Sequence, residues 1–294
     1  MEIRSKAKVF PQVSLIMPDN PETVSFYKMH GSGNDFILFD NRSLNLPQEK
    51  MSSWARALCP RAFAVGADGM IFLDSTPADD LDFVWHFFNS DGSRAEMCGN
   101  GSRCASLLAS KIGLAGRTQI FGTDAGPIKA MVLENDQIKV QLTPPKDLRL
   151  DISLLLEDGQ EVNIHYVNTG VPHVVVVCEN VKKVDISRMG KAIRFHRNFS
   201  PLGTNVNFIQ VTSKNFILLR TYERGVENET FACGTGAAAS AVVGGSLGLL
   251  NSPVKVTTSG GEGLSIDFSG DEVFLTGKAT IVYKAELMPE TFGL

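Results

Sequence analysis

The chain contains the stretch Met97–Gly101 (Met-Cys-Gly-Asn-Gly), and a similar stretch, Ala232–Gly236 (Ala-Cys-Gly-Thr-Gly), follows 135 residues later. Each cysteine leads into a run of small and apolar residues that ends at Gly-Leu, fifteen residues after the cysteine. Such a run favours a helix, so each thiol is predicted to lie at a helix N-terminus. The repeat predicts two similar halves that each present one thiol.

The repeat extends beyond the cysteines. Gly126 and Gly261 both lie 28 residues after their cysteine. Apolar runs bounded by turn residues predict strands in matching order, at 36–40, 83–88 and 118–123 in the first half and at 174–178, 216–221 and 254–258 in the second. Each half has one further predicted helix, at 47–58 and 185–195, and the uncharged run 237–247 is expected to be a buried helix.

The fold class that follows is α+β, with two pseudo-symmetric domains from an internal duplication. Each domain is predicted to be a mostly antiparallel sheet or barrel wrapped around a central helix, with the active site in the cleft between the domains. Residues 1–24 are interpreted as an N-terminal extension, with a secretory signal as the alternative. The N-terminal domain comprises 25–141 plus 278–294 and carries Cys98, and the C-terminal domain comprises 142–277 and carries Cys233.

Composition excludes several classes of function. A net charge of −4 and a pI near 5.8 give no electrostatic reason to expect nucleic acid or an anionic membrane as a partner. The five cysteines are few and odd in number, and no pair has Cys-x-x-Cys spacing, so neither a disulfide framework nor a metal site is expected. A cytoplasmic protein with reduced thiols fits this composition. Cys59, Cys104 and Cys178 are expected to be inert buried residues.

The two repeated thiols suit one kind of chemistry. Thiols on opposite sides of one carbon can remove a proton from one face and return a proton to the other, which is the reaction of a racemase or epimerase. A helix N-terminus lowers the pKa of a thiol and binds a carboxylate through free N–H groups. Those N–H groups also stabilise negative charge as it develops. No phosphate-binding motif and no lysine in a pyridoxal-phosphate context is present, so catalysis by side chains without a cofactor is expected.

These motifs resemble those of the diaminopimelate epimerase family, within the pyridoxal-phosphate-independent two-cysteine amino-acid racemases. The resemblance covers about residues 26–290, and the matching stretches are Lys28–Phe36, Phe88–Ser93, Met97–Arg103, Tyr222–Gly225 and Ala232–Ala237. Asn100 favours this family over proline racemases, which typically have His there. The resemblance implies interconversion of LL- and meso-2,6-diaminoheptanedioate, a step of lysine and peptidoglycan-precursor biosynthesis, by a homodimer acting on a small-molecule substrate.

The resemblance also implies roles for individual residues. Cys98 and Cys233 are the two bases, His173 assists the first and Glu223 lies near the second. The residues around the reacting carboxylate are Gly99, Asn100, Gly234 and Thr235. The residues at the distal end of the substrate are Asn34, Asn89, Asn205 and Arg224, with Glu223 also facing an ammonium group. Arg224 suits a carboxylate because a guanidinium binds both oxygens.

Two positions depart from the family pattern. Val171 stands where some members have a substrate-binding Asn, and Gly69 stands where some have Gln. Both changes concern binding of the distal end and leave the thiols intact. The alternatives are a proline-type racemase on the same scaffold, a redox protein in which Cys98 and Cys233 form a disulfide, and a non-catalytic binding protein. The carboxylate-binding Arg224 argues against the first, and the lack of a resolving cysteine pair argues against the second.

Overall fold

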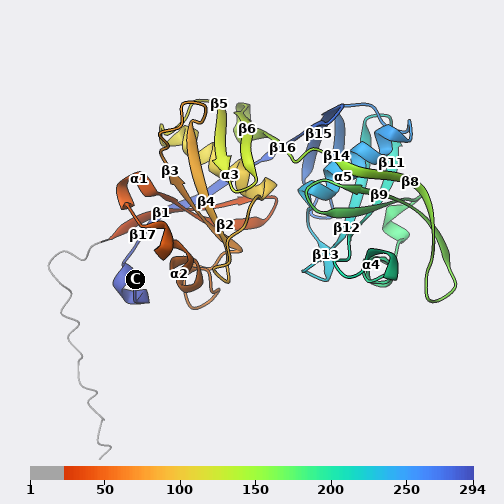
Figure 1. The fold of residues 1–294 in the computed structure, drawn as a ribbon, viewed down its shortest axis with the longest axis horizontal. Coiled ribbons are helices and arrows are strands. Elements are labelled where there is room, and N and C mark those ends of the chain that lie inside the picture. Colours follow the sequence, from red (N-terminus) through yellow and green to blue (C-terminus); the bar gives the residue numbers. More distant parts are fainter. Residues whose placement is uncertain (1–22) are drawn as a thin grey trace, which may run out of the picture.

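The computed structural model describes residues 23–294, so the predicted N-terminal extension lies almost entirely outside the described residues. The two halves form two lobes, coloured from red to yellow and from green to blue (Figure 1). The final strand returns from the second lobe to the first, where it lies beside the first strand. None of the helices of the described part is long and apolar enough to cross a membrane.

The first lobe is built from eight strands and three α-helices. Its elements are β1 (Val24–Gly31), β2 (Asn34–Asp40), α1 (Asn41–Leu44), α2 (Gln48–Leu58), β3 (Gly69–Asp74), β4 (Phe83–Asn89), α3 (Gly99–Lys111), β5 (Thr118–Thr123), β6 (Gly126–Val132), the 3₁₀ turn Glu134–Asp136, β7 (Gln137–Gln141) and, from the end of the chain, β17 (Thr280–Leu287) followed by the 3₁₀ turn Pro289–Phe292.

The second lobe is built from the intervening residues. Its elements are β8 (Lys146–Leu155), β9 (Glu161–Asn168), β10 (Pro172–Val177), the 3₁₀ turn Val181–Lys183, α4 (Ile186–Arg194), the 3₁₀ turn Arg197–Phe199, β11 (Asn205–Ser213), β12 (Phe216–Glu223), β13 (Asn228–Thr230), α5 (Gly234–Ser246), β14 (Val254–Thr257), β15 (Gly263–Ser269) and β16 (Glu272–Lys278).

Strand pairing shows that the two lobes share one topology. The neighbours in the first lobe run β17-β1-β2-β3-β4-β5-β6-β7, and in the second β8-β9-β10-β11-β12-β14-β15-β16. The parallel pairs fall at equivalent places, β2–β3 and β4–β5 in one lobe and β10–β11 and β12–β14 in the other. The other pairs in both rows are antiparallel, so the predicted duplication is confirmed.

One strand pair joins the lobes. β7, the last strand of the first row, pairs antiparallel with β16, the last strand of the second, from Gln141 opposite Phe274 to Gln137 opposite Lys278. The two rows thereby form one continuous sheet of 17 strands, in which the short β13 adds to β12.

Each lobe wraps its strands around a central helix, as expected. Helix α5 carries no charge, and most of its residues are buried, since it is apolar on every side. The largest apolar cluster includes residues of both α3 and α5, and these helices contact one another. Two outer helices cover the sheets: α2 packs Trp54 on Phe39 and Phe72, and α4 packs Gly190 closely against Tyr222.

The predicted elements are confirmed with small shifts. Helices expected over 47–58 and 185–195 occur as α2 and α4, and the strand expected over 118–123 is β5. The buried helix expected from residue 237 begins three residues earlier, at Gly234. The physical reason is that the Cys233 sulfur caps the first turn, which therefore tolerates two glycines.

Candidate active site

Both cysteines of the repeat occupy the same structural position. Cys98 is the N-cap of α3, and its sulfur accepts a hydrogen bond from the backbone N–H of Gly101 at 3.5 Å. Cys233 is the N-cap of α5, and its sulfur accepts from Gly236 at 3.4 Å. A cap of this kind places each sulfur at the positive end of a helix, among free N–H groups. The thiol lies where a helix binds an anion most readily.

The two thiols lie close enough to influence each other. Charge on Cys98 raises the pKa of Cys233, and Glu223 at the end of β12 raises the pKa of both cysteines. Burial is the largest cause for each thiol, and for Cys233 it raises the pKa to about 12. All five cysteines of the chain are free, Cys98 half-buried and Cys233 only 7% exposed. The two capped helices contact one another, and the two thiols are close enough for their charges to interact.

A row of hydrogen bonds fixes the asparagines on the Cys98 side. The Arg103 guanidinium donates to Asn100 Oδ1 at 2.8 Å, Asn100 Nδ2 donates to Asn34 Oδ1 at 3.3 Å, and Asn34 Nδ2 donates to Asp68 Oδ2 at 2.8 Å. The cation at one end and the carboxylate at the other determine which way each amide points. Asn34 Oδ1 also accepts from the Cys98 thiol, at 3.7 Å.

The carboxylate end of this row belongs to an ion-pair cluster. Arg61 bridges Asp35 (2.5 Å) and Asp68 (2.7 Å), and Lys28 lies 2.7 Å from Asp35. Burial raises the pKa of Asp35, but the hydrogen bonds and charges of Arg61 and Lys28 outweigh it and hold that pKa well below its usual range. Asp35 therefore stays ionised and anchors the loop that carries Asp68.

The Cys233 side is more sparsely equipped. The Thr235 hydroxyl lies 3.5 Å from the Cys233 sulfur, and the charge of the Glu223 carboxylate raises the pKa of this thiol. Burial raises the pKa of Glu223, partly offset by the neighbouring Thr230 hydroxyl. A carboxyl group with a raised pKa beside a thiol is suited to exchanging a proton with it.

His173, on β10, is held by Asn207 of β11. Asn207 Nδ2 donates to His173 Nδ1 at 3.1 Å and to the carbonyl of Val174 at 2.9 Å, while Asn207 Oδ1 accepts from Thr221 at 3.0 Å. These contacts assign the ring proton to Nε2, which is buried without a partner among the described residues. Burial lowers the pKa of His173 to about 3, helped by the charge of Arg224. The ring is thus neutral, and the structure shows no hydrogen bond from it to either thiol.

The residues expected at the distal end lie at two places. Asn205 uses its amide on the backbone, donating to the carbonyl of Pro172 at 3.0 Å and accepting from the N–H of Arg224 at 2.9 Å. It fixes the turn that presents Arg224, whose guanidinium also donates to the carbonyl of Leu202 at 3.4 Å. Asn89, in the other lobe, is exposed and donates to the Ser93 hydroxyl at 2.9 Å.

Gly69, one of the two departures, pairs with Asn89 across strands β3 and β4. A Cβ there would lie 2.8 Å from the Phe87 ring and 2.9 Å from the carbonyl oxygen of Phe88. In this chain the Phe87 ring occupies the space that a longer side chain at position 69 would need. The other departure, Val171, lies at the turn before β10 and is half-buried.

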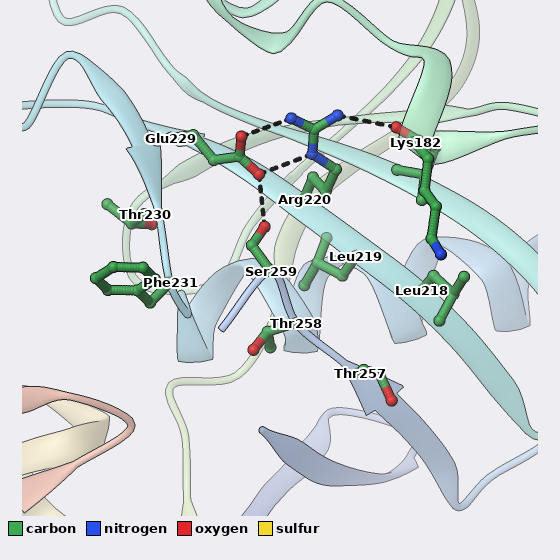
Figure 2. Close-up of a pocket in the computed structure, with 11 residues that line it drawn as sticks. Lys182, Leu218, Leu219, Arg220, Glu229, Thr230, Phe231, Thr257, Thr258 and Ser259 are labelled. Atoms are coloured by element: carbon green, nitrogen blue, oxygen red, sulfur yellow. Dashed lines mark hydrogen bonds and ion pairs between the residues drawn. The ribbon is translucent and has the colours of Figure 1, made fainter. Parts of the chain in front are cut away.

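The cavity drawn in Figure 2 lies beside this site, and its lining includes Thr230, the neighbour of Glu223. It has a volume of about 590 Å³ and lies in the second lobe between β12, β13 and the residues after β14. Two of its charges are paired: Arg220 lies 2.6 Å from Glu229, whose carboxylate also accepts a hydrogen bond from the Ser259 hydroxyl at 2.6 Å. No predicted site residue lines it.

A second cavity, of about 570 Å³, lies between the lobes and adjoins the site. It is lined by Ser32 and Gly33, which precede Asn34, and by Phe231, two residues before Cys233. Glu262 and Lys278 are the charged residues among the rest of its lining, which also includes His30, Ser259, Gly260 and Thr280. Among residues 23–294, no group of three or more His, Cys, Asp or Glu side chains is arranged to hold a metal ion.

Sequence reasoning missed three supporting residues of this site. In the sequence, Arg103 is only the last residue of the matching stretch Met97–Arg103, and neither Asn207 nor Asp68 belongs to the predicted site residues. Each acts by orienting another side chain, and a hydrogen bond between strands distant in sequence leaves no local pattern. The one available signal was a lone Arg in the otherwise small and apolar run after Cys98.

Comparison with known structures defines the class of fold. The chain resembles a phenazine biosynthesis protein of the PhzF family from Bacillus anthracis (TM-score 0.68, 17% identity, 90% of this chain and 99% of the other). It also resembles a hydroxyproline epimerase from Agrobacterium vitis (TM-score 0.68, 13% identity, 90% and 92%). These likenesses show that the chain has the two-lobed, duplicated fold of this structural class.

Sequence comparison identifies the family within that class. Residues 26–148 and 165–282 match the family model described as diaminopimelate epimerase. The chain is 49% identical over 277 residues to the diaminopimelate epimerase of Aquifex aeolicus (strain VF5), covering 91% of this chain and 99% of that one. The chain belongs to the diaminopimelate epimerase family.

Proposed function

We propose that the protein is an isomerase that interconverts LL- and meso-2,6-diaminoheptanedioate by proton transfer at one α-carbon. The observation that supports this proposal is the pair of thiols: each caps the central helix of one lobe, and charge on Cys98 raises the pKa of Cys233. Membership of the family supplies the identity of the substrate. The reaction serves lysine and peptidoglycan-precursor biosynthesis.

The chemistry uses one thiolate and one thiol. The thiolate removes the α-proton and becomes a thiol, while the electron pair of the broken C–H bond stays on the carbon. The opposite thiol donates its proton to the other face of that carbon and becomes a thiolate. After the product has formed, the cysteine that began as the thiolate is the thiol, and the other cysteine is the thiolate. The reverse reaction starts from that state. The charge that develops beside the carboxylate is stabilised by N–H groups at the starts of α3 and α5.

The surrounding residues bind the amino-acid groups. Gly99 and Asn100 on one side and Gly234 and Thr235 on the other receive the reacting carboxylate, because they form the two first helical turns. Arg224 binds the distal carboxylate, with Asn205 fixing its turn. His173 contributes as a neutral donor through Nε2 rather than as a base, since Asn207 occupies Nδ1.

Two further expectations concern the oligomeric state and the cellular location of the protein. The family resemblance supports a homodimer in the cytoplasm. Edge strand β17 exposes Val282 and Tyr283, which are 53% and 43% accessible and provide an apolar surface for a second copy. Sedimentation velocity on the full chain measures the oligomeric state directly, and a monomer at micromolar concentration refutes the dimer.

Proton exchange at the α-carbons tests the proposed reaction. The protein is incubated with LL-diaminopimelate in deuterated water under reducing conditions, without added cofactor, and the substrate is followed by NMR and chiral chromatography. We expect one deuterium at an α-carbon together with formation of the meso isomer. Cys98→Ser and Cys233→Ser should each abolish interconversion, whereas Cys178→Ser, which removes a thiol outside the site, should not.

The alternatives give different results in the same assay. Exchange into proline but not into diaminopimelate would transfer the protein to the proline-type racemases. No exchange into any amino acid with both thiols reduced would refute the two-base mechanism.

A further inference from the structure

Arg103 is the largest side chain that the fold buries completely, and it lies in the second turn of α3. Its guanidinium donates to Ser32 Oγ at 2.6 Å and to Asn100 Oδ1 at 2.8 Å. It also donates to the backbone carbonyls of Lys278, at 3.3 Å, and Gly99, at 3.4 Å. The cation therefore joins the first turn of α3 to the turn after β1 and to the end of β16 at Lys278.

The surrounding backbone is shaped to admit this guanidinium. A Cβ at Gly31 would lie 3.0 Å from its Nη2, and a Cβ at Gly277 would lie 3.2 Å from its Nε. None of the ion pairs among residues 23–294 includes Arg103. A buried charge with only neutral partners costs folding free energy, and an arginine stays protonated even there. A buried cation of this kind is explained if it stabilises a negative charge that forms nearby.

Cys98 provides that charge when it is a thiolate. The guanidinium reaches the carbonyl of Gly99, the residue that directly follows Cys98, and it fixes the row of amides that ends on the Cys98 sulfur. A positive charge in a dry environment favours the thiolate form of a neighbouring cysteine.

The second lobe lacks this cation. Arg103 lies five residues after Cys98, and the residue five after Cys233 is Ala238. The charged group that acts on Cys233 is the Glu223 carboxylate, which opposes a thiolate. The duplicated fold thus presents two equivalent thiols in environments of opposite charge.

We propose that Arg103 makes the two thiols unequal, so that in the substrate-free protein Cys98 loses its proton more readily than Cys233. Arg103 is a positioning residue, because it acts through its charge and through the Asn100 amide without touching substrate. The inference rests on the proposed two-thiol reaction. Its consequence is that the resting protein attacks first the isomer whose α-proton faces α3.

The charges around the two thiols support ionisation of Cys98 before Cys233. Burial raises the pKa of Cys98, the backbone N–H groups of Gly101 and Asn100 and the charge of Arg103 lower it, and Glu223 raises it again. For Cys233, Glu223 is the second-largest cause after burial, and no cation counters it. The other charges on the Cys98 side, the Lys28, Arg61, Asp35 and Asp68 cluster, act across Asn34 and are paired among themselves. The last two groups near Arg103 are Glu262, across the inter-lobe cavity, and the thiol of Cys104.

A titration of the thiols without substrate tests the proposal. The reduced protein is labelled with ¹³Cβ cysteine, and NMR follows each resonance with pH, because the Cβ shift reports thiolate formation even in a buried residue. Assignment uses Cys98→Ser and Cys233→Ser. We expect Cys98 to ionise at lower pH than Cys233, with the buried Cys59 and Cys104 as thiols that ionise only near pH 12.

Variants separate the charge from a merely structural role. Arg103→Met keeps the length and removes the charge, and it should lower the Cys98 thiolate fraction at fixed pH by about tenfold or more. Arg103→Lys should restore most of that fraction. If Arg103→Met does not fold, Glu223→Gln serves instead, and it should lower the Cys233 midpoint more than the Cys98 midpoint.

Two results would overturn the proposal: ionisation of Cys233 before Cys98 in the unmodified protein, or an unchanged Cys98 midpoint in folded Arg103→Met. Neither depends on diaminopimelate. A protein that titrates as expected but fails to exchange the substrate refutes the proposed function alone.

Discussion

Replacing Gly236 by alanine tests how closely the thiol, the helix start and the histidine support are packed. Gly236 is the third residue of α5, and a Cβ there would lie 2.3 Å from Asn207 Oδ1 and 3.2 Å from the Cys233 sulfur. Cβ contacts below 3.0 Å essentially do not occur, so Asn207 must move. Three hydrogen bonds hold Asn207 in place, to Val174, His173 and Thr221.

The expected loss follows from those contacts. Three buried hydrogen bonds at about 1 kcal/mol each amount to roughly 3 kcal/mol. Alanine returns about 0.5–1 kcal/mol relative to glycine inside a helix. The free energy of unfolding should therefore fall by about 2 kcal/mol in Gly236→Ala. A displaced Cys233 sulfur and a released His173 ring should lower the epimerisation rate by roughly 10²-fold, as small misplacements of catalytic groups do.

The repeat supplies a matched control in Gly101→Ala. Gly101 has the same position in α3, but its added Cβ would meet only apolar atoms, 3.2 Å from Ile71 Cδ1 and 3.4 Å from the Trp85 ring. A flexible methyl yields at little cost, so stability should stay within about 0.5 kcal/mol of the parent protein. Urea unfolding followed by circular dichroism measures both variants. Equal stability and equal activity of the two variants would refute the packing argument.

Two further predictions concern charge. Arg61 and Lys28 hold the folded pKa of Asp35 well below its unfolded value of ~4, so its stabilisation is complete above that value and declines only as the pH falls further toward the folded pKa. Asp35→Asn should therefore lower Tm at pH 6, and this deficit should shrink progressively as the pH falls from about 4 toward about 2. A deficit that does not change over that range contradicts the assignment. Arg220→Met should cost about 1–3 kcal/mol, because it leaves the Glu229 carboxylate without its cation. Epimerisation should stay intact, because no predicted site residue lines the cavity in Figure 2. A strong loss of activity in the folded variant would place that cavity in the reaction.

The sequence was sufficient for features whose pattern is local. The strand at 118–123 was predicted to the residue because it is a short run bounded by turn residues. The thiols were identified because glycine flanks and duplication are visible in the letters. Family membership, which the resemblance predicted, is confirmed by comparison.

The supporting contacts were not accessible in the same way. Asn207 reaches His173 across a parallel strand pair, and Arg103 reaches Lys278 across 175 positions of sequence. Asn205 was expected as a substrate ligand, and its amide is used on the backbone of Pro172 and Arg224 in this structure. Such contacts arise from how the lobes assemble, and a single sequence contains no periodic signal for them.

The return of β17 to the first lobe has a consequence for synthesis of the protein. All the strands of the second lobe lie between Lys146 and Lys278, so this lobe is complete as soon as β16 has left the ribosome. The first lobe is translated earlier, but the outer edge of β1 has no strand partner until β17 has been made. The lobe whose synthesis begins first is therefore the last to have all of its strands.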